Sequence, residues 1–149
     1  MRYRFVVAAV AAVTVAGCAD DASVVATTVI FDGETFTIDA PADCVRQLDG
    51  RLAILAPRQG APASTRDRVR VVLADTNRLV VESVGIRVGA SRGFSDVADE
   101  MWATKADDAY TVSGRLAPEA GSTTSHQFQI DVTCQHVRQE YMDIKPATG

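Results

Sequence analysis

The chain has 149 residues, and its 15 lysines and arginines are outnumbered by 19 aspartates and glutamates, which gives a net charge of −4 at pH 7. This length predicts one folded domain that can bury a sizeable core. An acidic domain repels other polyanions, so the composition argues against a nucleic-acid partner and against anionic lipid headgroups.

The N-terminal segment has the parts of a secretory signal in their usual order. Arg2 and Arg4 are positive, residues 5–16 are uncharged and mostly apolar, and the chain turns polar soon after Cys18. A positive start, an apolar middle and small residues at the end direct export. The apolar run is about half of the ~20 residues that a membrane-spanning helix needs. We therefore predict that residues 1–17 are a cleaved signal peptide.

The signal ends in Val15-Ala16-Gly17-Cys18, which has the pattern of a lipobox. The small residues let a peptidase approach the backbone, and the thiol can form a thioether to diacylglycerol. An ordinary secretory signal with a chance cysteine is the alternative. Each buried acyl methylene contributes about 0.8 kcal/mol, and two chains such as palmitate hold a protein stably on a membrane. We predict a mature protein that starts at Cys18 and is lipid-anchored to the extracytoplasmic face of the cell membrane.

Loss of the signal leaves 132 residues and a net charge of −6. Residues 18–26 are predicted to be a short tether, residues 27–134 a β-domain and residues 135–149 a C-terminal tail. The tail is polar, and the spacing of Val137, Tyr141 and Ile144 favours either a short helix or a loose end.

The β-domain is predicted from short runs of β-branched and apolar residues, several of which alternate with polar ones. Asp32-Gly33 and Asp49-Gly50 are hairpin signals. Gly85 suggests a bulge in a long strand. About eight short antiparallel strands predict an all-β sandwich or a partly closed barrel. The expected strands are 27–31, 34–38, 44–48, 51–55, 68–73, 79–88, 102–104, 110–116 and 128–134, with a helical turn within 95–101.

Two cysteines remain once Cys18 is assigned to lipid. Cys44 and Cys134 both lie in strand-like segments, and an exported compartment allows a disulfide between them. Such a bond would close a loop of about 90 residues and stabilise the domain by about 4 kcal/mol. Two buried free thiols are the alternative, which the compartment disfavours.

Gly89-Ala90-Ser91-Arg92-Gly93 matches the G-x-S-x-G pattern of a serine nucleophile. A strand precedes it, a short helix is conceivable after it, and His126 and His136 follow. The remaining chain is too short for the alternating strands and helices of such a hydrolase. We therefore interpret the segment as a glycine-rich turn and keep a Ser91 hydrolase only as a remote alternative, so that no catalytic residue is predicted.

Other candidate chemistry is weak. His126 and His136 have no Cys or His partner at metal-ligand spacing, so neither a metal nor a cofactor is expected. The pairs Asp20-Asp21 and Asp107-Asp108 are better explained as solvated turns than as catalytic carboxylates.

Trp102 and Tyr110 are the aromatic residues that could line a ligand site, although core packing is the expected use. The many Val, Ile and Leu side chains could likewise surround a cavity for an acyl chain or glycolipid instead of filling a core. A lipid-binding carrier domain is therefore the alternative function.

Several segments, in order, resemble one known family, the mycobacterial 19-kilodalton lipoprotein antigens. Cys18 and Cys44 fall where that family has its lipidated cysteine and one body cysteine. The other matching pieces are residues 29–33, 82–85, 103–105, Tyr110, 113–114 and 128–134.

The resemblance implies a non-enzymatic surface lipoprotein, acylated at Cys18 and bridged between Cys44 and Cys134, whose acylated N-terminus host Toll-like receptors sense. Two features depart from the family. The family prototype has a long Thr/Ser/Gly-rich tether that is glycosylated, whereas the tether here is short, with Ser23, Thr27 and Thr28 as its only nearby hydroxyls. About fifteen residues also follow Cys134, and the family gives no role for them.

Overall fold

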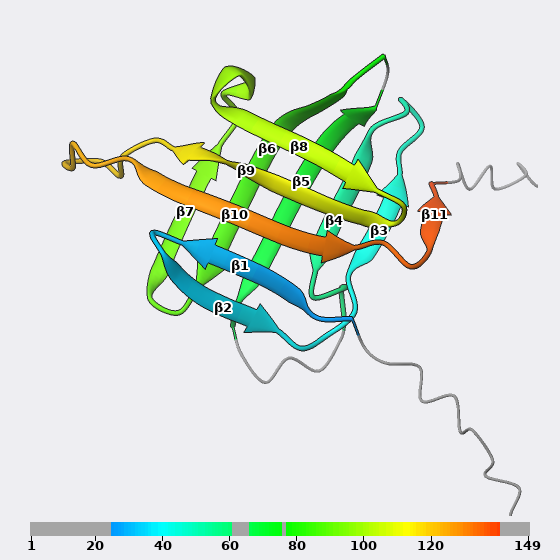
Figure 1. Cartoon of the computed structure of the whole chain (residues 1–149), viewed down its shortest axis with the longest axis horizontal. Coiled ribbons are helices and arrows are strands. Elements are labelled where there is room, and N and C mark those ends of the chain that lie inside the picture. Colours follow the sequence, from blue (N-terminus) through cyan, green and yellow to red (C-terminus); the bar gives the residue numbers. More distant parts are fainter. Residues whose placement is uncertain (1–24, 61–65, 76, 141–149) are drawn as a thin grey trace, which may run out of the picture.

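The computed structural model describes residues 25–60, 66–75 and 77–140. In these residues the chain forms eleven β-strands and one turn of 3₁₀ helix (Figure 1). They are Thr27–Phe31 (β1), Glu34–Ile38 (β2), Asp43–Arg46 (β3), Leu52–Ala56 (β4), Arg68–Asp75 (β5), Leu79–Val88 (β6), Ser91–Ser95 (β7), Ala98–Glu100 (η1), Met101–Ala106 (β8), Ala109–Leu116 (β9), His126–Thr133 (β10) and Val137–Gln139 (β11).

The strands form two sheets that pack face to face. The front sheet has the order β2-β1-β10-β9-β8, and the back sheet has the order β11-β3-β4-β5-β6-β7. In Figure 1 the front strands run across the back strands, and the two sheets do not close into a barrel. All neighbours are antiparallel except β11 and β3. The predicted sandwich is confirmed.

The core lies between the sheets because most strands alternate side chains that face the core with side chains that face outward. In β1 and β4 every second residue is buried, and β10 follows the same rule. Large side chains from both sheets meet in the middle, which favours a packed interior over a lipid cavity. The largest fully buried ones include Tyr110, Leu52, Ile54, Leu73, Leu116 and Ile130. Every buried core residue lies between Val29 and Cys134, so a chain that starts after Cys18 keeps the whole described core.

The predicted hairpins are confirmed. Asp32 and Gly33 both have positive φ, at 49° and 83°, as the tight turn between β1 and β2 requires. Gly50, with φ of 87°, lies in the turn between β3 and β4. Asp107-Asp108 is the exposed turn between β8 and β9, as expected.

The region around Gly85 differs from the expectation. Gly85 pairs regularly with Arg70 and Phe94, so it marks no bulge. The register shift falls instead where Val72 pairs with Ser83 and Leu73 pairs with Val81. Glu82 is thus the extra residue.

The segment after Gly89 is more regular than expected. Ser91–Ser95 forms edge strand β7, where the sequence predicted a glycine-rich turn, and only Ala98–Glu100 is helical. At Gly93 a Cβ atom would collide with the Leu116 side chain of the front sheet. Glycine is therefore needed at position 93 because the two sheets approach closely there, and not because the backbone adopts a conformation that only glycine favours.

The described part of the tail, residues 135–140, also differs from the expectation of a helix or a loose end. Val137–Gln139 is a strand that pairs in parallel with β3. The expected helix is wrong at Val137–Gln139, because all three β11 residues are exposed and pairing with a sheet edge determines their conformation. Tyr141 and Ile144 lie outside the described residues. No helix within the described ranges is long and apolar enough to cross a membrane.

Candidate functional site

Several predicted site residues lie outside the described part of the chain. These are Cys18, the signal of residues 1–17, Asp20-Asp21 and Ser23. Of the two tether-side threonines, Thr27 is buried and its Oγ1 has no hydrogen-bond partner in the described residues. Thr28 is half-buried within β1. Neither hydroxyl is presented as an open glycosylation site.

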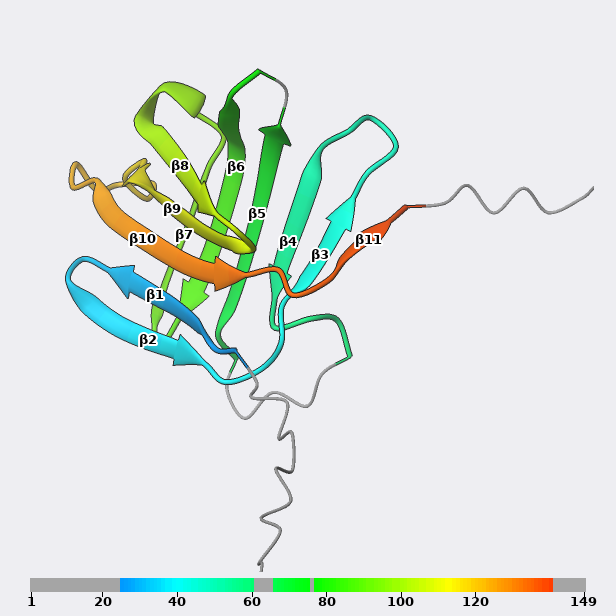
Figure 2. The ribbon, with the colours of Figure 1, turned by 45° about the vertical axis from the view of Figure 1, so that its right-hand side comes forward.

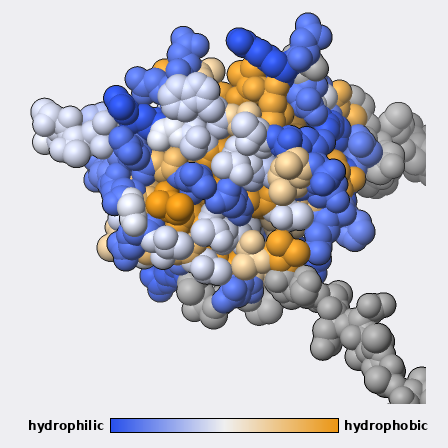
Figure 3. All heavy atoms as spheres, in the orientation of Figure 1, coloured by the Kyte–Doolittle hydropathy of each residue, from blue (hydrophilic) through white to orange (hydrophobic). Residues whose placement is uncertain are grey.

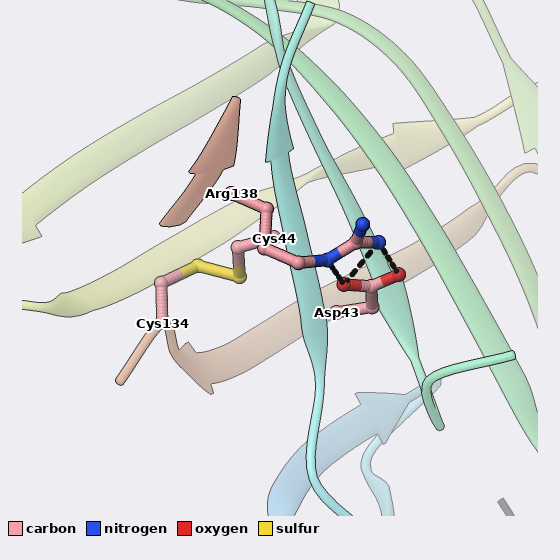
Figure 4. The surroundings of a disulfide bond; sticks show 4 residues. All are labelled: Asp43, Cys44, Cys134 and Arg138. Carbon is pink, nitrogen blue, oxygen red and sulfur yellow. Dashed lines mark hydrogen bonds and ion pairs between the residues drawn. A yellow bond between two sulfur atoms is a disulfide. The ribbon is translucent and has the colours of Figure 1, made fainter. Parts of the chain in front are cut away.

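The Cys44–Cys134 disulfide joins the two sheets (Figure 4). Cys44 lies in β3 of the back sheet, and Cys134 follows the last residue of β10 in the front sheet. Their Cα atoms are 5.8 Å apart, within the usual range for a disulfide. Both cysteines are buried. The disulfide confirms the predicted pairing and excludes the alternative of two free thiols.

The chain after Cys134 is held against β3 by polar contacts. Arg138 donates to both carboxylate oxygens of Asp43, with distances of 2.7 to 3.0 Å (Figure 4). The hydrogen bonds to Asp43, and then its charge, raise the pKa of the Arg138 guanidinium. Glu140 N–H donates to the carbonyl of Arg46. These contacts explain why the tail continues the back sheet as β11.

Ser91 does not lie on a nucleophile elbow. It is the first residue of β7 and pairs with Val88, so the turn leads from strand to strand and not into a helix. A nucleophilic serine also needs a base within hydrogen-bond reach. In the described residues no hydrogen bond joins Ser91 to a histidine, and the Nδ1 atom of His126 instead lies 2.6 Å from Asp32. The arrangement that serine hydrolysis requires is not assembled here.

His126 of β10 contacts the hairpin formed by β1 and β2. Its ring stacks on Phe31, and Asp32 also accepts a hydrogen bond from the N–H of Gln127. The hydrogen bond with His126, followed by that of Gln127, lowers the pKa of Asp32. His136 is exposed between Cys134 and β11. Within the described ranges no three His, Cys, Asp or Glu residues are grouped to hold a metal ion.

The two aromatic residues have different surroundings. Tyr110 is buried, as expected, but Trp102 is 62 % exposed, so the prediction of core packing was wrong for Trp102. Met101 faces the core, and alternation turns its neighbour outward on edge strand β8. Trp102 borders an open hollow of about 410 Å³. The other lining residues include Asp99, Glu100, Ser113, Arg115 and Gln127.

The outer face of the back sheet carries a feature that sequence reasoning missed. Arg68, Arg87 and Arg92 lie directly beside one another on β5, β6 and β7, because Arg68 pairs with Arg87 and Arg87 pairs with Arg92. Arg70 follows on the same face. All four are exposed and line a hollow of about 360 Å³. We call these four residues the arginine face. The only sequence signals were the i, i+2 spacing of Arg68 and Arg70 and the turn between Arg87 and Arg92.

Comparison with known proteins identifies the family. A family model described as Mycobacterium 19 kDa lipoprotein antigen matches residues 20–134. The match contains the ten strands β1 to β10 and both disulfide cysteines, and it leaves out β11. A comparison with curated proteins gave no match. The match covers more than half of the chain and confirms the resemblance seen in the sequence, so this chain belongs to the mycobacterial 19 kDa lipoprotein antigen family.

Proposed function

We propose that the protein is a non-enzymatic lipoprotein of the cell envelope, anchored by acyl chains on Cys18 to the extracytoplasmic face of the membrane. Residues 1–17 would direct export, and residues 18–26 would connect the anchor to the β-sandwich. The family is named for lipoprotein antigens, which supports this role. The acylated N-terminus would be the part that host Toll-like receptors sense.

The cysteine arrangement carries the proposal. The chain has three cysteines, and two of them form the Cys44–Cys134 disulfide. A structural disulfide suits an exported protein, because cytosolic thiols are kept reduced. Cys18 is the remaining cysteine, and it directly follows the small residues Ala16 and Gly17. An exported chain with this motif has the thiol that diacylglycerol transfer requires.

The test is the mass and location of the mature protein in a mycobacterial host. We expect an N-terminal peptide that begins at Cys18 and carries diacylglycerol, in a protein recovered with the membrane fraction. Cys18→Ser should leave the protein unprocessed or release it, because a hydroxyl cannot form the thioether. Ala22→Ser is the matched control, since it adds the same hydroxyl in the tether and should stay acylated. Normal processing and membrane retention of Cys18→Ser would refute the anchor.

A further inference from the structure

The arginine face is a charged surface that the fold itself does not neutralise. In the described residues no carboxylate forms an ion pair with Arg68, Arg70 or Arg87, and Arg92 reaches Glu119 only at 4.0 Å. Elsewhere on the back sheet the acids are engaged: Glu82 pairs with Arg51 at 2.8 Å. Like charges directly opposite each other destabilise a sheet. The row therefore opposes folding, and an anion placed on it would remove that repulsion.

The hollow between these side chains has the chemistry of a phosphate site. One guanidinium group can donate two parallel hydrogen bonds to the oxygens of a phosphate. It is also less strongly hydrated than a lysine ammonium group. Gly85 and Gly93 line the hollow together with the four arginines. Gly85 pairs with Arg70 and Phe94 on this outer face, and because it has no side chain a headgroup phosphate can approach the sheet there, between the charges. The missing side chain of Gly93 points toward Leu116 in the core instead.

An exposed aromatic residue adjoins the charges. Phe94 is 59 % exposed and lies two residues beyond Arg92 on the same face of β7. Its ring passes 3.8 Å from the position of a Cβ atom on Gly85. Basic residues beside an exposed aromatic ring are typical of surfaces that rest on a membrane, with the ring at the headgroup level.

The charged row lies at the end of the molecule where the described chain begins. In Figures 1 and 2 the starts of β1 and β5 both lie at the lower end of the sandwich. Contacts link these points: Thr27 pairs with Ile38 of β2, and Phe36 of β2 lies against Gly89. Gly89 N–H in turn donates to Asp67, the residue before Arg68. Nine extended residues, 18–26, span at most about 30 Å, so an anchor at Cys18 would keep this end near the membrane.

From these observations we infer that the arginine face docks onto the phosphate groups of anionic phospholipids in the membrane that holds the anchor. The inference rests on the proposed function, because the anchor at Cys18 is what brings the face to the membrane. It also revises the expectation from net charge, since an acidic domain binds an anionic surface when its cations gather on one side.

The experiment measures binding of the acyl-free chain, residues 19–149, to lipid vesicles by cosedimentation. The chain should bind vesicles of phosphatidylcholine mixed with phosphatidylglycerol, but not phosphatidylcholine alone, and added salt should weaken binding. Each basic residue near an anionic surface contributes about fivefold to partitioning, so R68Q/R87Q/R92Q should lower it roughly a hundredfold. Circular dichroism confirms that the variant is folded.

The matched control is R78Q/K105Q/R115Q, which also removes three positive charges, but from exposed positions off the arginine face. It should bind within a few-fold of the parent. An equal loss in both variants would show that only total charge matters, and equal binding to neutral vesicles would exclude phosphate recognition. Displacement by inorganic phosphate at constant ionic strength would assign the site to a soluble phosphate compound instead. An absence of vesicle binding would overturn the inference and leave the acylation of Cys18, which mass spectrometry measures separately, untouched.

Discussion

The outer faces of the two sheets follow the same alternation but satisfy their polar groups differently. On the front sheet Asp131 accepts hydrogen bonds from Thr111 at 2.7 Å and from Gln129 at 2.9 Å. On the back sheet Arg87 has an arginine on either side. In Figure 3 the front face is mostly hydrophilic or intermediate, with hydrophobic residues in separate patches. The carboxylate of Asp131 is thus satisfied by neighbours on its own face, whereas the arginine row on the other face leaves its charge for a partner.

This difference shows why net charge is a poor guide to binding. The chain is acidic overall, yet four of its arginines lie on one side of three adjacent strands. The acids are distributed among turns, edges and pairs such as Asp43–Arg138 and Asp32–His126. A molecule can therefore repel anions on average and attract them locally.

The largest effect is expected from breaking the covalent link that holds the two contrasting sheets together. The double variant Cys44→Ala/Cys134→Ala should lower the free energy of unfolding by about 4 kcal/mol, because the disulfide closes a long loop in the unfolded chain. Urea denaturation of the acyl-free chain measures this. Reduction of the parent protein should produce a similar loss. A change below about 1 kcal/mol in both cases would mean that packing alone holds the sheets together.

A smaller effect with the opposite sign is expected within the arginine face. Arg87→Glu places a carboxylate between Arg68 and Arg92, and the free energy of unfolding should rise by several tenths to about 1 kcal/mol as repulsion becomes attraction. The same variant should bind anionic vesicles more weakly than the parent. Thermal unfolding and cosedimentation, performed on one protein preparation, measure both effects.

Arg115→Glu is the control on the front face. Arg115 pairs with Gln127 and lines a hollow with Asp99 and Glu100, so the reversed charge gains no cation across the strand. The free energy of unfolding of the Arg115→Glu variant should equal that of the parent or be lower. If Arg87→Glu and Arg115→Glu raised the free energy of unfolding equally, the effect would come from total charge and not from a difference between the two faces.

The smallest effect is expected at the turn between β1 and β2 of the front sheet, where the Asp32 carboxylate pairs with His126. His126 lowers the pKa of Asp32, so this interaction stabilises the fold above the ordinary aspartate pKa of about 4 and is lost as the pH falls through the lower folded value. Asp32→Asn should be less stable than the parent at neutral pH, and the gap should close near pH 2. Asparagine tolerates the positive φ of this turn, so the variant tests the charge and not the backbone.

Urea denaturation at both pH values measures the Asp32 effect. A gap of the same size at neutral and acid pH would indicate that the substitution acts through the turn. Asp49→Asn is a matched control, because Asp49 lies in the other early hairpin turn and, within the described residues, forms an ion pair with exposed Arg51. That variant should show a smaller change with pH.

Local sequence determined much of this protein. Alternation of apolar and polar residues predicted most strands, since one face of each must be buried. Asp-Gly pairs marked two hairpins because they accept positive φ. The cysteine count and the predicted export signal led to the Cys44–Cys134 disulfide as a prediction, and short motifs in order indicated the family.

Tertiary structure decided what depends on residues far apart in the chain. Pairing with a neighbouring strand made β7 out of a glycine-rich segment and β11 out of a tail with helical spacing. Alternation from buried Met101 turned Trp102 to solvent. The arginine face exists only because the register of β5, β6 and β7 aligns Arg68, Arg87 and Arg92. A one-residue shift of a strand moves each side chain to the other face, so composition alone could not reveal that row.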